Sequence, residues 1–178
     1  MIPSSERIKY RQIDPESVEQ AHEALDQEGL MRFYGFKDPK ELAIQTERME
    51  KGLSSFDKSY RYFHLLDPSS GNMMGWCGFH TWYTQHARAE IGYWITDESR
   101  RGEGLMTEAM KAILHYGFEV MRLHRMEAFI GPDNFPSLKL VQRFGFQKEG
   151  VLREHYQVDG RMEDSVAYGL LRHEFENN

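Results

Sequence analysis

The pattern of hydrophobic and polar positions is clearest between residues 88 and 120. Residues 88–96 (RAEIGYWIT) are rich in β-branched and aromatic residues, which predicts a strand. Residues 99–104 are polar and contain two glycines, which predicts a loop. Beyond this loop the apolar positions recur at helical spacing and predict a long helix: Leu105, Ala109, Ala112, Ile113, Tyr116 and Val120.

Two aspartate–proline pairs indicate where helices begin in the first third of the chain. Asp14 and Asp38 are each followed by proline, so each aspartate is an N-cap and each proline the first helical residue. Glu41 stands at the capping-box position of the second helix. We therefore expect two helices before residue 60, with a loop near residues 30–37.

Short alternating or apolar runs predict the strands. A short helix is expected over residues 138–144, and Asp159-Gly160 is typical of a hairpin turn. The predicted strands are residues 6–13, 60–67, 73–83, 88–96, 124–130, the segment from Glu149 to the hairpin turn, and residues 164–171.

The resulting order is β-α-α-β-β-β-α-β-α-β-β, which predicts an α/β (α+β) layer fold with a mixed, largely antiparallel sheet. The chain contains no repeat, low-complexity tract or long linker. A length of 178 residues suits one domain with a substantial core. We expect a single domain over residues 1–178.

The glycine loop has the features of an anion site. Gly102 and Gly104 allow close approach of a ligand, and the helix that begins at Leu105 presents unpaired N–H groups and the positive end of its dipole. Arg100 and Arg101 add donors with phosphate-matching geometry. The spacing fits neither the nucleoside-triphosphate loop nor the dinucleotide fingerprint, so the predicted ligand is a pyrophosphate of another kind.

Composition narrows the function classes. A net charge of -6 argues against a general nucleic-acid binder and favours cationic substrates through steering. The histidines show no metal-ligand spacing, so we expect no bound metal. The single cysteine cannot form an internal disulfide, so we expect a reducing compartment. No run has the length of a membrane span, and the first residues have no apolar signal core. We expect a cytoplasmic protein without membrane contact.

Six motifs in order extend the argument beyond the loop: AEIGYW, TEAM, LHRMEAFIGPDN, SLKLVQRFGF, EGVLRE and YGLL. Together they resemble the GNAT acetyltransferases, and most closely the branch with RimJ/RimL-type ribosomal-protein alanine N-acetyltransferases and spermidine N-acetyltransferase. The resemblance covers about residues 60–175 well and the first third loosely. It implies the GNAT fold, with helices on both faces of the sheet, and acetyl-CoA as cosubstrate.

The resemblance also implies where the coenzyme binds. Its pyrophosphate is expected on the glycine loop, and Trp94 to Thr96 are expected to offer backbone groups to the pantetheine as an added strand would. We expect the Trp94 side chain to pack in the core. Lys139 and Arg143 either reach the outer phosphate or form a solvated face. The predicted coenzyme-binding residues are Trp94, Ile95, Thr96, Arg100, Arg101, Gly102, Glu103, Gly104, Leu105, Met106, Thr107, Asn134, Lys139 and Arg143.

Glu90 is the first candidate for the base. Transfer from a thioester to an amine requires that the amine lose a proton, and a glutamate of this strand serves as base in several members of the superfamily, directly or through water. The alternative is a sheet-face glutamate paired with a basic neighbour such as Arg88.

Ser137 is the candidate group for the departing sulfur. Related enzymes often place a tyrosine one turn further along this helix, where this chain has Val141. Ser137 either orients or protonates the thiol, or caps the helix. By the same resemblance Asn134 contacts the pantetheine or ordered water beside it; its alternative role is the helix cap, and neither role excludes the other.

The sequence predicts an acetyl-CoA-dependent N-acetyltransferase that acts on a primary amine. The acceptor is left open between a protein N-terminus, a polyamine and another small amine, and so is the formation of a homodimer. The alternative is a non-catalytic acyl-CoA sensor, which the absence of the tyrosine would allow. The first third of the chain and the loops near residues 30–37 and 153–164 are expected to determine the acceptor.

Overall fold

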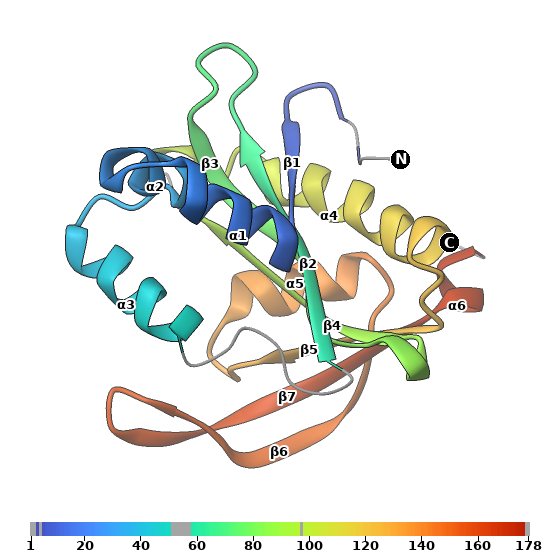
Figure 1. Cartoon of the computed structure of the whole chain (residues 1–178). Coiled ribbons are helices and arrows are strands. Elements are labelled where there is room, and N and C mark those ends of the chain that lie inside the picture. Colours follow the sequence, from blue (N-terminus) through green and yellow to red (C-terminus); the bar gives the residue numbers. More distant parts are fainter. Residues whose placement is uncertain (1–2, 4, 51–57, 97, 177–178) are drawn as a thin grey trace.

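A computed structural model describes residues 3, 5–50, 58–96 and 98–176. Its strands form one sheet in the order β1-β2-β3-β4-β5-β7-β6, in which β4 and β5 are parallel and all other neighbours are antiparallel (Figure 1). This confirms the predicted mixed, largely antiparallel sheet. The strands are β1 (Lys9–Ile13), β2 (Lys58–Leu66), β3 (Met73–Tyr83), β4 (Arg88–Ile95), β5 (Arg125–Ile130), β6 (Gln147–Val158) and β7 (Arg161–Leu171).

The predicted helix starts are confirmed. Asp14 caps α1: its carboxylate accepts a hydrogen bond from the Ser17 N–H at 3.0 Å. The Glu41 carboxylate accepts from the Asp38 N–H at 3.1 Å at the start of α3. The α-helices are α1 (Pro15–Ala24), α2 (Gln27–Tyr34), α3 (Pro39–Glu50), α4 (Leu105–His115), α5 (Phe135–Arg143) and α6 (Arg172–Glu176). Two short 3₁₀ helices, η1 (Thr84–His86) and η2 (Glu98–Arg100), and a π-helix that continues α4, η3 (Tyr116–Val120), complete the set.

The expectation of two helices and a loop near residues 30–37 was wrong, because α2 is a separate helix. Asp26 caps its start by accepting from the Gly29 N–H at 2.8 Å, and Gly35 ends it in the left-handed conformation at φ +71°. Both signals are present in the sequence, but the helix is only eight residues long. Its stability comes from packing Phe33 and Tyr34 against the sheet.

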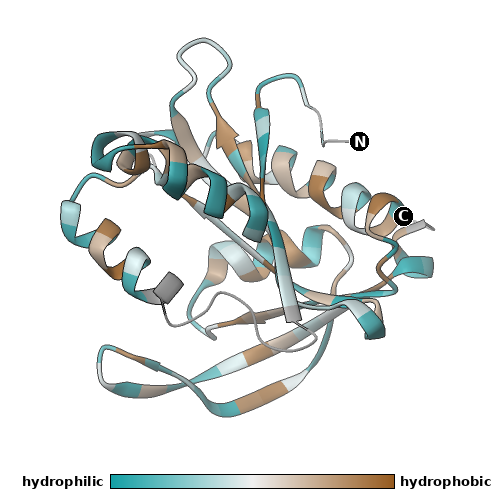
Figure 2. Ribbon diagram, in the orientation of Figure 1, coloured by the Kyte–Doolittle hydropathy of each residue, from teal (hydrophilic) through white to brown (hydrophobic). Residues whose placement is uncertain are grey.

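Helices cover both faces of the sheet. On one face α4 and α5 bury a core with Phe63, Phe79, Met110, Met126 and Val141. On the other face α1, α2 and α3 bury a smaller cluster with Ile13, Val18, Phe33, Tyr34 and Leu42. Figure 2 shows the outer side of α1 as hydrophilic, as expected for a helix that covers a sheet.

Strands β4 and β5 separate soon after they begin. They pair only at Arg88–Arg125, Ala89–Met126 and Glu90–Glu127 among the described residues, although β4 continues to Ile95 and β5 to Ile130. Beyond Glu90, the edge of β4 that faces β5 therefore has no partner strand in the described part of the chain. An extended ligand can add to such an edge.

Candidate active site

The glycine loop leads directly into α4. Gly102 and Gly104 both adopt the left-handed conformation, with φ +86° and +79°. Gly104 is the N-cap of α4, and no side chain of the described residues caps that helix, which leaves its first N–H groups available to a ligand. A side-chain carbon at Gly102 would meet no atom within 4 Å, and one at Gly104 would meet only Arg7, at 4.0 Å. The loop is open on the side where a ligand would bind.

The two arginines of the loop face carboxylates. Arg100 lies 2.9 Å from Glu103 and 3.3 Å from Asp67. Arg101 lies 3.1 Å from Glu98, and its guanidinium lies over the Trp94 ring, 5.1 Å from the centroid. Both side chains are held at the loop by these contacts.

The end of α5 lies beside the start of α4. Arg143 donates to the Thr107 hydroxyl at 3.3 Å. Lys139 and Arg143 are exposed. Met106 packs partly against the core, and the Leu105 side chain is fully within the core, so only its backbone N–H can face a ligand.

Asn134 is the N-cap of α5, because its side-chain oxygen accepts from the Ser137 N–H at 3.3 Å. The alternative in which Ser137 caps this helix is therefore wrong. Ser137 is half-buried and lies beside the Tyr93 phenol. Burial raises the pKa of Tyr93, and the Ser137 side chain opposes that rise. Val141 is fully buried in the core.

Glu90 is buried and forms no ion pair with an arginine among the residues that the structure describes. It is 9% exposed, and the described ion pair of Arg88 is with Glu127, at 2.6 Å. The pairing of Glu90 with Arg88 is therefore wrong. Burial, reinforced by the nearby charge of Glu127, raises the pKa of Glu90 to about 7. A carboxyl group with this pKa can accept a proton near neutral pH.

Two residues that the sequence analysis did not single out interact with Glu90. His80 lies opposite Glu90 in the β3–β4 register, and its Nδ1 is 3.6 Å from a Glu90 carboxylate oxygen. Burial lowers the pKa of His80, so its ring is neutral at pH 7. Burial, together with the charge of Glu90, raises the pKa of Tyr156 on β6. Both residues lie on other strands, so no local pattern connects them to Glu90.

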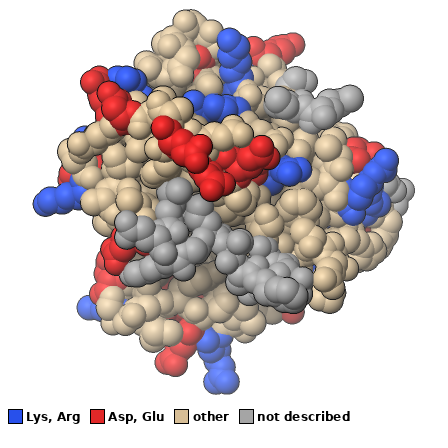
Figure 3. All heavy atoms as spheres, viewed as in Figure 1, with Lys and Arg blue, Asp and Glu red and all other residues tan. Residues whose placement is uncertain are grey.

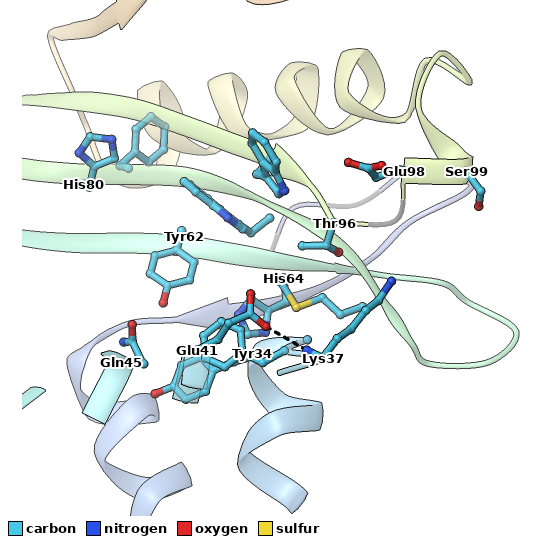
Figure 4. Close-up of a pocket in the computed structure, with 16 residues that line it drawn as sticks. Tyr34, Lys37, Glu41, Gln45, Tyr62, His64, His80, Thr96, Glu98 and Ser99 are labelled. Carbon is cyan, nitrogen blue, oxygen red and sulfur yellow. Dashed lines mark hydrogen bonds between the residues drawn. The ribbon is translucent and has the colours of Figure 1, made fainter. Parts of the chain in front are cut away.

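A cavity of about 810 Å³ opens between α2 and α3 on one side and strands β2 to β4 on the other. His80 lies at one end of it, and Glu98 and Ser99 lie at the other end, next to the glycine loop (Figure 4). Trp94 lines the cavity and is 56% exposed. The expected core position of Trp94 is therefore wrong, because the cavity separates this part of β4 from the helices. Thr96 also lines the cavity, and Ile95 packs partly against the core.

Acidic side chains gather over α1 on the face shown in Figure 3, where Glu16, Glu19 and Glu23 are exposed. Among the residues that the structure describes, no group of three or more histidine, cysteine, aspartate or glutamate side chains could hold a metal ion. Nor does any helix of the described ranges have both the length and the apolar character that a membrane crossing requires.

The chain is similar to known acetyltransferases along most of its length. Residues 7–147 match the family model described as an acetyltransferase (GNAT) domain. The spermidine N(1)-acetyltransferase of Escherichia coli (strain K12) is 25% identical over 175 residues, which are 98% of this chain and 91% of that protein.

Two solved structures extend the comparison. The spermidine/spermine N-acetyltransferase SpeG from Vibrio cholerae shares the fold, with a TM-score of 0.68 at 19% identity over 95% of this chain and 98% of that one. RimJ from Mycobacterium smegmatis, in complex with CoA-disulfide, is 30% identical, with a TM-score of 0.58 over 63% of this chain and 53% of that one.

Proposed function

This chain belongs to the GNAT acetyltransferase family and is an N-acetyltransferase, and from that premise we propose that it transfers the acetyl group of acetyl-CoA to a primary amine held in the cavity beside Glu90. The observation that carries this proposal is the buried Glu90 carboxyl, which lies in the strand that leads to the open glycine loop and has no arginine partner within the described ranges. We propose residues 1–178 as one such domain.

The residues around the loop and the separated strands fit acetyl-CoA. Gly102 to Thr107 would hold the pyrophosphate with backbone N–H groups at the positive end of α4, and Arg100 and Arg101 would add charge. The free edge of β4 from Trp94 to Thr96 would pair with the pantetheine, and Asn134 would contact it from α5. Lys139 and Arg143 are proposed contacts of the outer phosphate. Binding of CoA-disulfide by the related RimJ supports this placement.

Acetyl-CoA supplies a thioester whose carbonyl carbon is attacked by the amine nitrogen. Glu90 takes the amine proton, directly or through a water molecule. With a pKa of about 7, a substantial fraction of Glu90 is ionised at pH 7 and can act as base. The C–S bond breaks, and Ser137, at the start of α5, orients or protonates the sulfur.

The acceptor is proposed to be a primary amine of a polyamine or of a peptide N-terminus. The acidic side chains over α1 and the net charge of -6 support a cationic acceptor. The whole-chain similarity to an enzyme named for spermidine supports a polyamine. The resemblance to the RimJ/RimL branch supports a peptide.

A direct assay tests the proposed function. Release of free CoA is measured with a panel of amines and peptides, and acetyl-CoA binding is measured in parallel by calorimetry. An enzyme releases CoA faster when an acceptor is added. A non-catalytic sensor, which is the alternative function, would bind acetyl-CoA and release CoA at the same slow rate with every acceptor.

Replacing Ser137 with alanine is expected to lower turnover by only about tenfold. A CoA thiol has a pKa near that of free cysteine, about 8.5, so it leaves well without full protonation. The measurement is steady-state turnover with one acceptor, together with the affinity for acetyl-CoA. A thousandfold loss with coenzyme binding intact would show that Ser137 is essential for the departing sulfur.

A further inference from the structure

His64 of β2 lines the cavity and is held there by a half-buried arginine. His64 is 2% exposed. Arg11 Nη2 lies 2.6 Å from His64 Nδ1 and 2.7 Å from the carbonyl oxygen of Phe33, to which it also donates. The same guanidinium lies over the Phe33 ring, 4.5 Å from the centroid. These contacts fix Arg11, and Arg11 in turn fixes the imidazole.

The contact with Arg11 determines which ring nitrogen of His64 carries the proton. A guanidinium has N–H donors and no acceptor, so His64 Nδ1 must accept. Burial, together with the charge of Arg11, lowers the pKa of His64 to about 3, so the ring is neutral at pH 7. The one remaining ring proton is therefore on Nε2. That atom has no hydrogen-bond partner in the described part of the chain, so it is available to donate to a ligand.

Two aromatic rings pack against the imidazole. The Phe33 ring lies at 67° to it with 5.3 Å between centroids, and the Tyr62 ring lies 5.9 Å away. A donor whose ring cannot turn selects its partner more strictly than a mobile one, because the cost of orienting it has already been met in folding.

His64 has a positive charge beside it, the Arg11 guanidinium. Arg11 forms no ion pair with a carboxylate among the described residues, and burial lowers its pKa. Its Nε atom is also buried without a hydrogen-bond partner. A half-buried cation with no carboxylate partner among the described residues makes the surroundings of His64 favourable for an oxygen lone pair and unfavourable for an ammonium group.

The carboxylates elsewhere in the cavity do not cancel this effect. Glu98 is exposed and forms an ion pair with Arg101 at 3.1 Å. Glu41 is exposed, and one of its oxygens accepts from the N–H groups of Lys37 and Asp38, each at 3.1 Å. Exposed and already bonded carboxylates contribute little to the binding of a further cation, because water and salt screen them.

His64 and Glu90 lie far enough apart to require an extended acceptor. His64 pairs with Trp76, which pairs with Trp94, and Glu90 lies four residues from Trp94 along β4. That is about 13 Å along the strands and about 10 Å across them. In Figure 4, His64 lies between the His80 end of the cavity and the Glu98 end. The two components combine to about 16 Å between the backbone positions, and the reach of the two side chains shortens the span, so an acceptor that reaches both residues has about 10 Å or more between its reacting amine and the group that meets His64.

Building on the proposed function, we propose that His64, supported by Arg11, determines the specificity of the acceptor site by donating from Nε2 to a carbonyl oxygen of an extended acceptor. A peptide presents such an oxygen at every residue, and successive residues advance about 3.3 Å, so the third or fourth residue reaches this distance. A protonated polyamine offers N–H donors only and cannot accept this bond. The acceptor class that fits is the N-terminal segment of a peptide.

The test compares three acceptors in the wild type and in His64→Phe: tetraalanine amide, spermidine and octylamine. We expect the wild type to prefer tetraalanine amide over octylamine about tenfold or more in kcat/KM. His64→Phe should lower kcat/KM for tetraalanine amide about tenfold and leave that for octylamine nearly unchanged. His64→Gln, whose amide can donate, should keep part of the preference.

The other outcomes overturn the proposal in distinguishable ways. An equal loss with all three acceptors in His64→Phe would give His64 a structural role only. A wild type that prefers spermidine to tetraalanine amide would contradict the assigned acceptor. If no amine is acetylated, the proposed function fails. The role of His64 is then tested by the binding of tetraalanine amide and spermidine without turnover.

Nitrogen NMR gives that separate readout without turnover. We expect the His64 signals, identified by their loss in His64→Gln, to report a neutral ring with the proton on Nε2 between pH 5 and 7. Adding tetraalanine amide to the CoA-loaded protein should shift the Nε2 signal, and adding spermidine should not. A ring protonated on Nδ1, or an Nε2 signal that does not respond to the peptide, would refute the proposal.

Discussion

Replacing Glu90 with glutamine is expected to lower turnover by about a hundredfold or more, with little change in acetyl-CoA affinity. Glutamine fills the same space but cannot take a proton from the amine. The variant should remain folded, because a buried carboxyl with a raised pKa destabilises the protein once it ionises. Between the usual pKa of a glutamate and about 7 the folded state binds more protons than the unfolded state, so this group makes the free energy of unfolding fall as pH rises.

The pH dependence separates the role of base from a structural role. In the wild type, kcat/KM should rise as pH passes through about 7, because only ionised Glu90 acts as base. Glu90→Gln should lose this rise, and its deficit should shrink at high pH, where more of the amine is already neutral. Near-normal turnover of the variant at pH 7 would assign Glu90 to structure alone.

Glu127→Gln is the matched control for Glu90. Glu127 lies opposite Glu90 in the β4–β5 register, but it forms ion pairs with Arg88 at 2.6 Å and with Arg125 at 2.9 Å. Its negative charge contributes to the raised pKa of Glu90. Removing that charge should move the rise in kcat/KM to lower pH and should leave turnover above pH 8 close to the wild-type value. A Glu127→Gln profile that coincides with the wild type would show that the rise belongs to another group.

Replacing Gly104 with valine is expected to weaken acetyl-CoA binding by about a hundredfold or more. Gly104 caps α4 at φ +79°, a conformation that valine avoids, and the space outside the loop is open to a ligand. Valine would both shift the backbone and occupy that space. Calorimetry of acetyl-CoA binding to the folded variant measures the effect.

Gly71→Val controls for the backbone strain. Gly71 has φ +73° in the turn between β2 and β3, and a side-chain carbon there would meet no atom within 4 Å. The Gly71→Val substitution should lower the stability of the protein about as much as Gly104→Val does, and it should leave the affinity for acetyl-CoA unchanged. Unchanged acetyl-CoA affinity in a folded Gly104→Val protein would refute the proposal that the pyrophosphate binds at this loop.

The sequence by itself determined the parts of the molecule that depend on neighbouring residues. The helix that begins at Leu105, the caps at Asp14 and Asp38 and the strand over residues 73–83 all follow from patterns within one or two turns. The ordered motifs were sufficient for the family. The helix α2 was missed although Asp26 and Gly35 mark its ends, because a helix this short depends on packing rather than on its own pattern.

Only the tertiary structure decided which side chains meet. Arg88 and Glu90 are two residues apart on one strand, so their side chains project from the same face of the sheet. The sequence pattern alone therefore favoured their pairing. The parallel register of β5 brings Glu127 to Arg88 instead and leaves Glu90 beside His80. In the same way, pairing of β1 with β2 places Arg11 against His64, 53 residues away. Such contacts depend on strand register across the sheet, which is set by the packing of the whole chain and has no local signature.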